Sequence, residues 1–173
     1  FPGPGLGGHC LPIDPIYLSW KAQQVGVKSD FIDLAAQINR SVPDQVVHKL
    51  EKTFDEKNQE LNGKKVLVLG LAYKKNIDDA RESPSYEILD ILKKKGAKID
   101  YSDPYIEVFP ETRRYNFDIK SIVLNERNLE LYDAVILATD HDDFDLDLIQ
   151  RKSKILIDTR GVCDKTLNNV VRL

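Results

Sequence analysis

Three short runs of consecutive apolar residues constrain the fold of this 173-residue chain more than any other feature of its sequence. They occupy residues 66–69, 134–138 and 155–157, and the first run ends at Gly70. None of them alternates apolar with polar side chains, so each predicts a strand that is buried on both faces, as in a parallel sheet. Helical patterns separate the runs. This alternation predicts an α/β fold built on a doubly wound parallel sheet.

The remaining patterns complete the expected order of elements. Apolar residues at helical spacing predict helices at 15–25, 29–58, 83–96 and 143–151. Two more strands are expected at 98–101 and 119–123, and the last strand of the chain at 155–158. Pro43 lies inside the second helical pattern and predicts a kink or a restart there, with Ser41 as the new N-cap.

The chain begins with a stretch rich in glycine and proline that leads to a cysteine. Residues 1–8 hold four glycines and two prolines, and such a loop brings bare backbone N–H groups close to an anion or an oxygen-rich ligand. Asp14 and Pro15 are predicted to be the N-cap and first residue of a helix. Cys10 would then lie just ahead of a positive helix terminus, which stabilises a thiolate. The alternative is a simple turn with a buried structural cysteine, and the spacing fits both.

Polar residues follow the predicted strands at the edge where parallel sheets bind ligands. The connection after the first strand, residues 71–82, is longer than the usual ~2–6 residues of a β–α unit. It carries Lys74, and Arg160 follows the last predicted strand, so both are expected to face one crevice and to suit a phosphate. The alternative for each is a solvated surface charge. His141 follows the second run and is a further candidate to line the cleft. The first connection lacks the Gly-x-Gly-x-x-Gly pattern of dinucleotide sites.

The composition excludes several classes of partner. Lys and Arg number 25 against 28 Asp and Glu, and no basic run alternates with aromatic residues, so nucleic acid is not an expected partner. No apolar stretch reaches membrane-spanning length and no signal-peptide pattern is present, so no membrane partner is expected. Cys10 and Cys163 lie in contexts that predict neither a disulfide nor a metal site, and the expected compartment is the cytoplasm. The chain lacks methionine and opens inside a loop, which we interpret as the C-terminal part of a larger protein.

Two motifs together give the chain a specific resemblance. Residues 2–15 read PGPGLGGHCLPIDP, residues 70–76 read GLAYKKN, and residues 79–84 read DARESP. In this order they resemble the UDP-glucose/GDP-mannose dehydrogenase family over essentially the whole chain. The resemblance implies that residues 1–62 hold the catalytic-cysteine loop and the central helices, and that residues 63–173 form a Rossmann-like domain that binds a UDP-sugar. It also implies that the family's N-terminal NAD-binding domain is absent here, so that this chain alone would be inactive.

The resemblance also implies a reaction and a set of site residues. The C6 hydroxyl of the sugar would be oxidised in two steps to a uronic acid, with NAD as the hydride acceptor. Cys10 would hold the intermediate as a thiohemiacetal and then a thioester, and Asp14 would orient or activate water. Arg81 would reach NAD, and Asn39 and Arg40 would point toward the same site. The implied substrate-binding residues are Phe1, Gly3, Gly5, Gly7, Gly8, Lys74 and Arg160.

Two positions in the first motif narrow the range of substrates that the resemblance implies. Family members that oxidise UDP-glucose typically carry Ser and Lys where this chain has His9 and Ile13. The sequence therefore resembles the branch that acts on UDP-N-acetylhexosamines in polysaccharide synthesis, with UDP-GlcNAc favoured. The alternatives are a UDP-ManNAc or UDP-glucose dehydrogenase, and a nucleotide-sugar-binding module in which Cys10 is structural. A third alternative is a cysteine hydrolase that uses His9 and Cys10, but no second motif in the sequence supports it. The central helices are expected to form a homodimer, and the alternative is a helical spacer.

Overall fold

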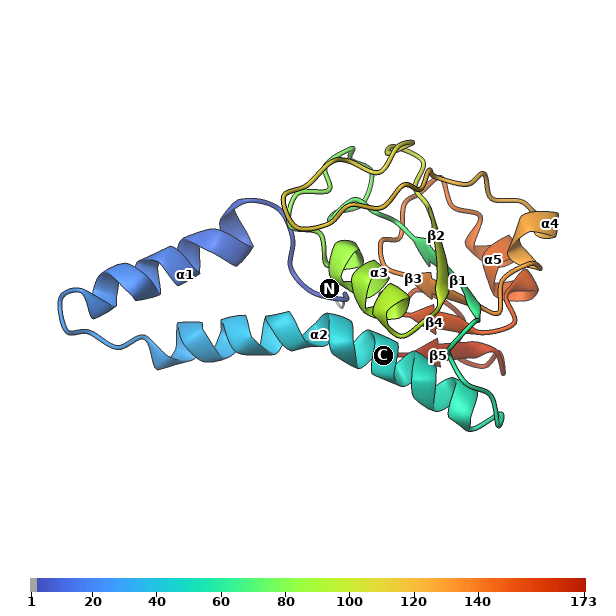
Figure 1. The fold of residues 1–173 in the computed structure, drawn as a ribbon, viewed down its shortest axis with the longest axis horizontal. Coiled ribbons are helices and arrows are strands. Elements are labelled where there is room, and N and C mark those ends of the chain that lie inside the picture. Colours follow the sequence, from blue (N-terminus) through green and yellow to red (C-terminus); the bar gives the residue numbers. More distant parts are fainter. Residues whose placement is uncertain (1–2) are drawn as a thin grey trace.

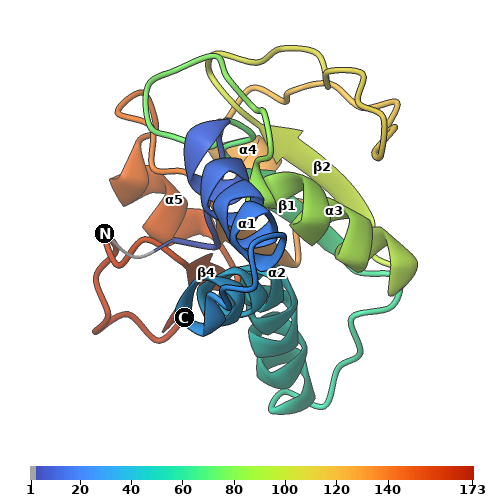
Figure 2. The ribbon, with the colours of Figure 1, turned by 90° about the vertical axis from the view of Figure 1, so that its left-hand side faces the viewer.

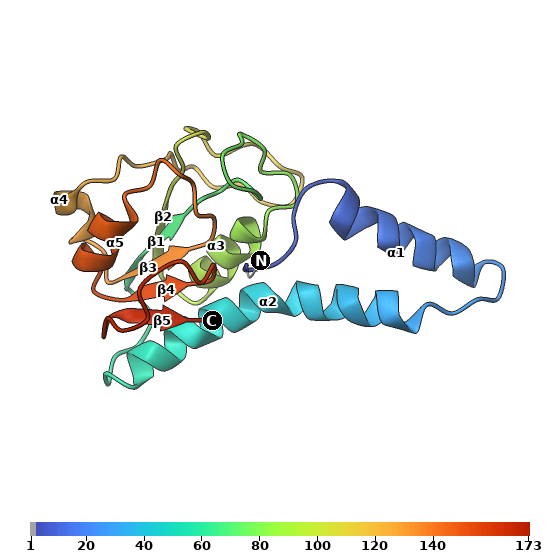
Figure 3. The same ribbon diagram turned by 180° about the vertical axis from the view of Figure 1, so that it is seen from behind.

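The computed structural model describes residues 3–173, which form a helical arm and an α/β domain (Figure 1). The arm consists of α1 (Cys10–Gln23) and the first part of α2 (Asp30–Asp55), and Figure 3 shows from behind that the two helices run antiparallel away from the domain. The domain then continues through β1 (Lys65–Leu69), α3 (Pro84–Lys94), β2 (Lys98–Ser102), α4 (Glu126–Leu129), β3 (Ala134–Leu137), α5 (Leu146–Lys152), β4 (Leu156–Asp158) and β5 (Val170–Arg172).

The strands form one parallel sheet in the order β2-β1-β3-β4-β5. The chain moves from β1 outward to β2 and then passes back to β3 on the other side of β1, so the winding reverses between β1 and β3. The register aligns the carboxyl ends, because Leu69 is paired with both Ser102 and Leu137, and Leu137 is paired with Asp158. Sheets of this kind bind ligands beyond that edge, at the point of reversal. The predicted doubly wound parallel sheet is confirmed.

Helices cover both faces of the sheet, and Figure 2 shows α3 and α5 on opposite sides of it. Val66 and Val68 of β1 belong to a core shared with α2 and α3, whereas Leu67 and Leu69 belong to a second core shared with α4 and α5. All four side chains are fully buried. Burial on both faces explains why this strand is an unbroken apolar run. Within residues 3–173, no helix is long and apolar enough to cross a membrane.

The predicted start of the first helix is wrong. α1 begins at Cys10 with His9 as its N-cap, and Pro15 lies inside it. Pro12 is tolerated because it falls in the first turn, where a backbone N–H has no helical partner. Pro15 removes the single hydrogen bond that its N–H would have made to the carbonyl four residues earlier. Asp14 is therefore an interior helical residue and not a cap.

Of the two outcomes predicted at Pro43, a kink or a restart of the helix, the restart is wrong. α2 is one continuous helix that begins after Ser29 and contains Pro43 as a buried residue. The Ser41 hydroxyl donates to the carbonyl of Ile38 at 2.8 Å and does not cap a new helix. Figure 1 shows that α2 bends along its length, as a helix with an internal proline does.

Several short elements differ from the sequence prediction, although the strands over the three apolar runs and at 98–102, and α3 with its Ser83 cap, are confirmed. The strand expected at 119–123 is replaced by isolated bridges, Tyr101 to Ser121 and Val108 to Lys120. α5 begins at Leu146 because Asp145 caps it by accepting the N–H of Leu148 at 2.9 Å. β5 and α4 span three and four residues, which is too short for a periodic pattern.

Candidate nucleotide-sugar site

The chain turns sharply where β1 ends, at the carboxyl edge of the sheet. Gly70 has a φ of +87°, and a Cβ there would lie 2.4 Å from the Cβ of Thr139 and 2.7 Å from its backbone N. Only glycine fits both the conformation and the close contact. The Ser85 hydroxyl holds the turn by donating to the Gly70 carbonyl at 2.8 Å. The turn begins the long loop 71–82 beside the reversal between β1 and β3.

This loop and the glycine-rich loop before α1 border a cavity of about 570 Å³. Lys74 lines the cavity from the first loop, and Arg160 lines it from the segment after β4. The structure thus places both cations at one edge of the sheet, where the sequence predicts them. Gly3, Gly5 and Gly7 line the same cavity together with apolar side chains of α1 and α2. Gly8, which is also expected there, does not line this cavity but lines a second, larger one. Phe1 lies outside the described residues.

Arg160 is a largely buried cation with fixed partners. Its Nε donates to the carbonyl of Ala138 at 2.6 Å, and its Nη2 donates to the Thr139 hydroxyl at 3.2 Å. Burial lowers the pKa of Arg160 from its ordinary value, while the Asp140 carboxylate, 3.8 Å from Nε, opposes that change. A guanidinium remains charged under these conditions. A Cβ at Gly3 would lie 2.9 Å from Nη1, so the loop approaches the cation closely because it has no side chain there.

The glycine-rich loop is docked on both the loop after β1 and α2. A Cβ at Gly7 would lie 2.4 Å from the Cβ of Tyr73, so the two loops are in direct contact. The N–H of Gly8 donates to the carbonyl of Arg81 at 2.8 Å. From α2, the side-chain oxygen of Asn39 accepts a backbone N–H of the loop at 2.8 Å. The two sequence motifs therefore form one structural unit.

Cys10 is the first residue of α1, and its thiol is exposed. Asp14 is also exposed and follows one helical turn later, a spacing that puts the two side chains on one face of α1. Neither residue is among those that line the 570 Å³ cavity, although Leu11 is. The structure thus brings the predicted catalytic pair together on a helix beside the cavity, with both side chains open to solvent.

A larger cavity of about 980 Å³ lies between the arm and the domain. Arg40 and Arg81 line it, and Asn39 lines both cavities. Arg81 is paired with Asp79, with Nε 3.0 Å from Oδ1 and Nη2 2.6 Å from Oδ2. Hydrogen bonding to Asp79 raises the pKa of Arg81, and a negative charge at Cys10 would act in the same direction. Arg81 therefore lies within electrostatic range of the predicted nucleophile.

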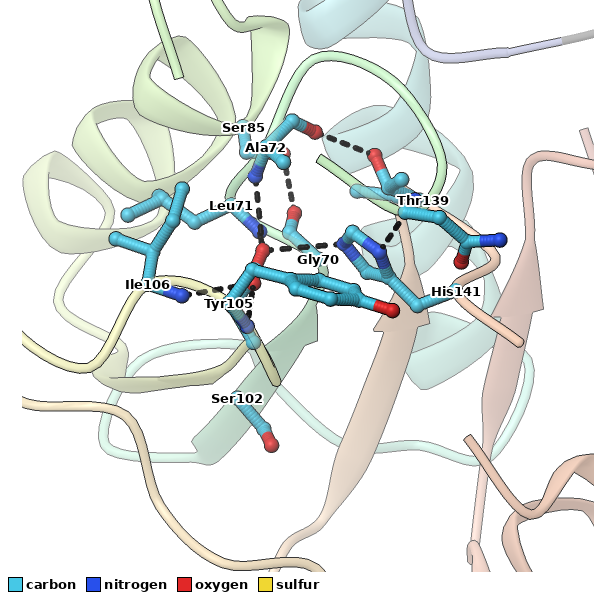
Figure 4. Close-up of polar contacts among 12 residues, drawn as sticks. Gly70, Leu71, Ala72, Ser85, Ser102, Tyr105, Ile106, Thr139 and His141 are labelled. Carbon is cyan, nitrogen blue, oxygen red and sulfur yellow. Dashed lines mark hydrogen bonds and ion pairs between the residues drawn. The ribbon is translucent and has the colours of Figure 1, made fainter. Parts of the chain in front are cut away.

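A buried polar cluster, which the sequence does not predict, lies at the ends of β1, β2 and β3 (Figure 4). Asp103 accepts the N–H groups of Leu71 and Ala72 through Oδ2, at 2.7 and 2.9 Å, and the same oxygen lies 3.2 Å from Nε2 of His141. Its Oδ1 accepts the N–H of Tyr105 at 2.8 Å. Burial alone would raise the pKa of Asp103, but hydrogen bonds from His141, Ala72 and Tyr105 outweigh burial and lower it.

His141, His48 and Cys163 line neither of the two cavities. His141 is 1% exposed and is not among the residues that line either cavity, so the prediction of a cleft-lining position is wrong. His48 is exposed on α2. Cys163 is buried, and burial together with the nearby Asp158 raises its pKa to about 12. Within residues 3–173, no group of three or more His, Cys, Asp and Glu side chains is arranged to hold a metal ion.

Comparison with known families matches both parts of the chain. Residues 67–165 match the UDP-glucose/GDP-mannose dehydrogenase family, UDP binding domain, and residues 1–41 match the central domain of the same family.

Individual relatives extend the match along the chain. The UDP-N-acetyl-D-mannosamine dehydrogenase of Methanococcus vannielii is 31% identical over 174 residues, which cover 96% of this chain and 37% of that protein. The UDP-N-acetyl-D-glucosamine 6-dehydrogenase of Salmonella typhi is 32% identical over 142 residues, which cover 82% of this chain and 32% of that protein. A structure of UDP-D-ManNAc dehydrogenase from Pyrococcus horikoshii superposes with a TM-score of 0.78 at 27% identity, over 98% of this chain and 38% of that one. The chain thus spans between 32% and 38% of the length of these relatives.

Proposed function

The chain belongs to the UDP-glucose/GDP-mannose dehydrogenase family, and on that premise we propose that its α/β domain binds the UDP part of a nucleotide sugar between Lys74 and Arg160. One observation carries this proposal. Both cations and the glycine-rich loop line a single cavity beyond the reversal between β1 and β3. A guanidinium and an ammonium at one wall suit the two charges of a diphosphate.

Isothermal titration of the chain with UDP tests this site. We expect UDP to bind, and we expect Lys74→Ala to weaken binding about tenfold, because a charge-assisted hydrogen bond to phosphate is lost. The matched control is Lys57→Ala, which removes another exposed lysine, just after α2 and outside the residues lining the cavity. Absence of UDP binding, or equal effects of the two substitutions, would refute the site.

We further propose that Cys10 is the nucleophile of a C6 oxidation. NAD⁺, when bound, supplies the hydride acceptor, and because one NAD⁺ accepts one hydride, the two transfers use two NAD⁺ molecules in turn. Between the two transfers the Cys10 sulfur adds to the C6 aldehyde and forms a thiohemiacetal, and after the second transfer it holds a thioester. Water then cleaves the C–S bond and gives the carboxylate and the free thiol. Asp14, one turn along α1, orients that water.

The structure supports placing the NAD site largely outside this domain. In a dinucleotide site the backbone N–H groups after the first strand receive the pyrophosphate. Here the N–H groups of Leu71 and Ala72 are already donated to Asp103. Arg81, which lines the larger cavity within electrostatic range of Cys10, is the residue that fits a contact with NAD. We therefore expect no NADH when the chain alone is mixed with NAD⁺ and UDP-GlcNAc. A rise in absorbance at 340 nm, which reports NADH, would contradict an NAD site outside this domain.

Replacing Cys10 in the complete gene product separates the enzyme from a nucleotide-sugar-binding module. We expect Cys10→Ala and Cys10→Ser to abolish uronic acid formation and to leave UDP affinity unchanged. The alternative module gains some support from the exposed position of Cys10 beside the cavity rather than in its wall. Undiminished activity in Cys10→Ala would sink the catalytic role and favour that module.

We propose a UDP-N-acetylhexosamine as the substrate, with UDP-GlcNAc ahead of UDP-ManNAc and UDP-glucose. The support is His9 and Ile13 in the first motif, together with relatives named for the N-acetylated sugars. The ratio of kcat/KM for the three nucleotide sugars, measured on the complete gene product, decides between them. A preference for UDP-glucose would refute the assignment of the branch.

We also propose that the arm mediates a homodimer. Several large apolar side chains of α1 and α2 are more than half exposed, and soluble proteins usually cover such surfaces. Those that line neither cavity are Tyr17 65%, Leu18 60% and Trp20 51%. A helical spacer would leave these residues without a partner in the described structure.

A further inference from the structure

His141 makes contacts that serve the loop carrying Lys74, although it does not itself line the cavity. Its ring is fully buried at the carboxyl end of β3. Nδ1 accepts the N–H of Asn76 at 3.0 Å, and Nε2 lies 3.2 Å from Oδ2 of Asp103 (Figure 4). Because a carboxylate cannot donate, the hydrogen on Nε2 must point to Asp103, and Nδ1 keeps the lone pair that accepts Asn76. The hydrogen-bond pattern therefore assigns the Nε2–H tautomer.

The carboxylate of Asp103 thereby fixes the loop on both sides of Lys74. It receives the N–H groups of Leu71 and Ala72 directly. It holds the ring of His141, and that ring holds Asn76. Lys74 itself is exposed, and the loop that carries it is held by these flanking contacts and by two hydrogen bonds between the Asn76 side chain and Asp142.

The same end of β3 also holds the second cation. The carbonyl of Ala138 accepts Nε of Arg160 at 2.6 Å. The hydroxyl of Thr139 donates to the carbonyl of Ala72 at 2.7 Å and accepts Nη2 of Arg160 at 3.2 Å. Residues 138–141 thus contact the Lys74 loop and the Arg160 side chain at once.

We propose that His141 is a positioning residue, which through Asn76 sets where Lys74 lies relative to Arg160 and so adapts the site to a diphosphate. This inference rests on the proposed function, because it concerns the same UDP site. The element that acts on the loop is the acceptor at Nδ1, whereas the contact of Nε2 with Asp103 only orients the ring.

Two substitutions at His141 separate the role of Nδ1 from the role of Nε2. In His141→Asn the amide oxygen lies close to the place of Nδ1 and can still accept the N–H of Asn76. In His141→Gln the amide nitrogen reaches the place of Nε2 and can donate to Asp103, but Asn76 loses its acceptor. We expect His141→Gln to weaken UDP binding about tenfold in titration calorimetry, since the partly buried N–H of Asn76 loses its acceptor and the bound loop conformation becomes less favourable. His141→Asn is expected to stay close to the wild type.

Hydrogen exchange gives a readout that does not need the ligand. The backbone amide of Asn76 should exchange faster in His141→Gln than in the wild type and in His141→Asn. If the wild type does not bind UDP, the proposed function fails, and the exchange rates still decide whether His141 positions the loop. Equal exchange at Asn76 in both variants, with equal UDP affinity, would overturn the proposal.

A measurement on the wild type covers the case in which a variant does not fold. Long-range ¹H–¹⁵N correlation distinguishes the two neutral tautomers of histidine. We expect the Nε2–H form for His141 at neutral pH. The Nδ1–H form or a protonated ring would remove the acceptor for Asn76 and would refute the proposed role.

Discussion

Replacing Asp103 by Asn tests whether the buried carboxylate organises the edge of the sheet. The carboxylate accepts five hydrogen bonds: three at Oδ2, from Leu71, Ala72 and His141, and two at Oδ1, from Tyr105 and Ile106. An asparagine amide has one oxygen and one NH₂ group. Whichever way it turns, its NH₂ group faces either two or three donors that lose their acceptor.

The expected cost follows from those lost partners. A buried donor left without an acceptor costs about 1–3 kcal/mol, and partial relaxation of the loop lowers the sum, so we expect a loss of about 3–5 kcal/mol in the free energy of unfolding. With a urea slope of about 1–3 kcal/mol/M, the midpoint of unfolding should fall by roughly 1–5 M.

Far-UV circular dichroism in urea measures this loss. The single tryptophan, Trp20, lies on the arm and is 51% exposed, so its fluorescence does not report on the domain. Asp142→Asn is the matched control, because that carboxylate is exposed and paired with Lys75 on the same edge, and such pairs are worth about 1 kcal/mol or less. A stability of Asp103→Asn within about 1 kcal/mol of the wild type would show that the five contacts do not organise the edge.

Three further predictions concern pH, backbone and assembly. The pKa of Asp103 is lowered in the folded state, so its stabilisation is complete above the unfolded value and is lost as pH falls through the folded value; acid should therefore reduce the free energy of unfolding of the wild type more than that of Asp103→Asn. Gly70→Ala should cost about 3–5 kcal/mol in urea unfolding, because its Cβ would meet Thr139. Gly63→Ala, at φ +78° with open space around the Cβ, should cost about 1–2 kcal/mol, and equal costs would contradict the steric argument. Leu18→Glu should convert a dimer to a monomer in sedimentation equilibrium without lowering the thermal midpoint of the domain, and an unchanged mass would refute the proposed dimer surface.

Features that depend on local pattern could be predicted from the sequence. The run at 66–69 predicts β1 because burial on both faces removes alternation, and Ser83 with Pro84 predicts the start of α3 because both satisfy its first turn. Lys74 and Arg160 could be placed at one edge because parallel strands align their carboxyl ends.

Features that depend on distant partners could not be predicted. Asp103 and His141 are 38 residues apart, and each alone resembles an ordinary polar residue after a strand. The Asp-Pro pair at residue 103 predicts only a turn, although its carboxylate holds the neighbouring loop. Asp14 and Pro15 do not start a helix, as their pattern predicts, because α1 begins at Cys10 and tolerates the loss of one hydrogen bond at Pro15.

The reactivity of Cys10 toward iodoacetamide tests the central claim most directly. The wild-type chain is alkylated with and without UDP-GlcNAc, and the rates at Cys10 and Cys163 are read by peptide mass spectrometry. Cys163 is the internal reference, because it is buried and its pKa is raised to about 12. We expect Cys10 to react faster than Cys163 and to be protected by UDP-GlcNAc, which would place the sugar beside the thiol. Unchanged labelling of Cys10 at UDP-GlcNAc concentrations that saturate the UDP site would contradict a catalytic Cys10 beside the bound nucleotide sugar.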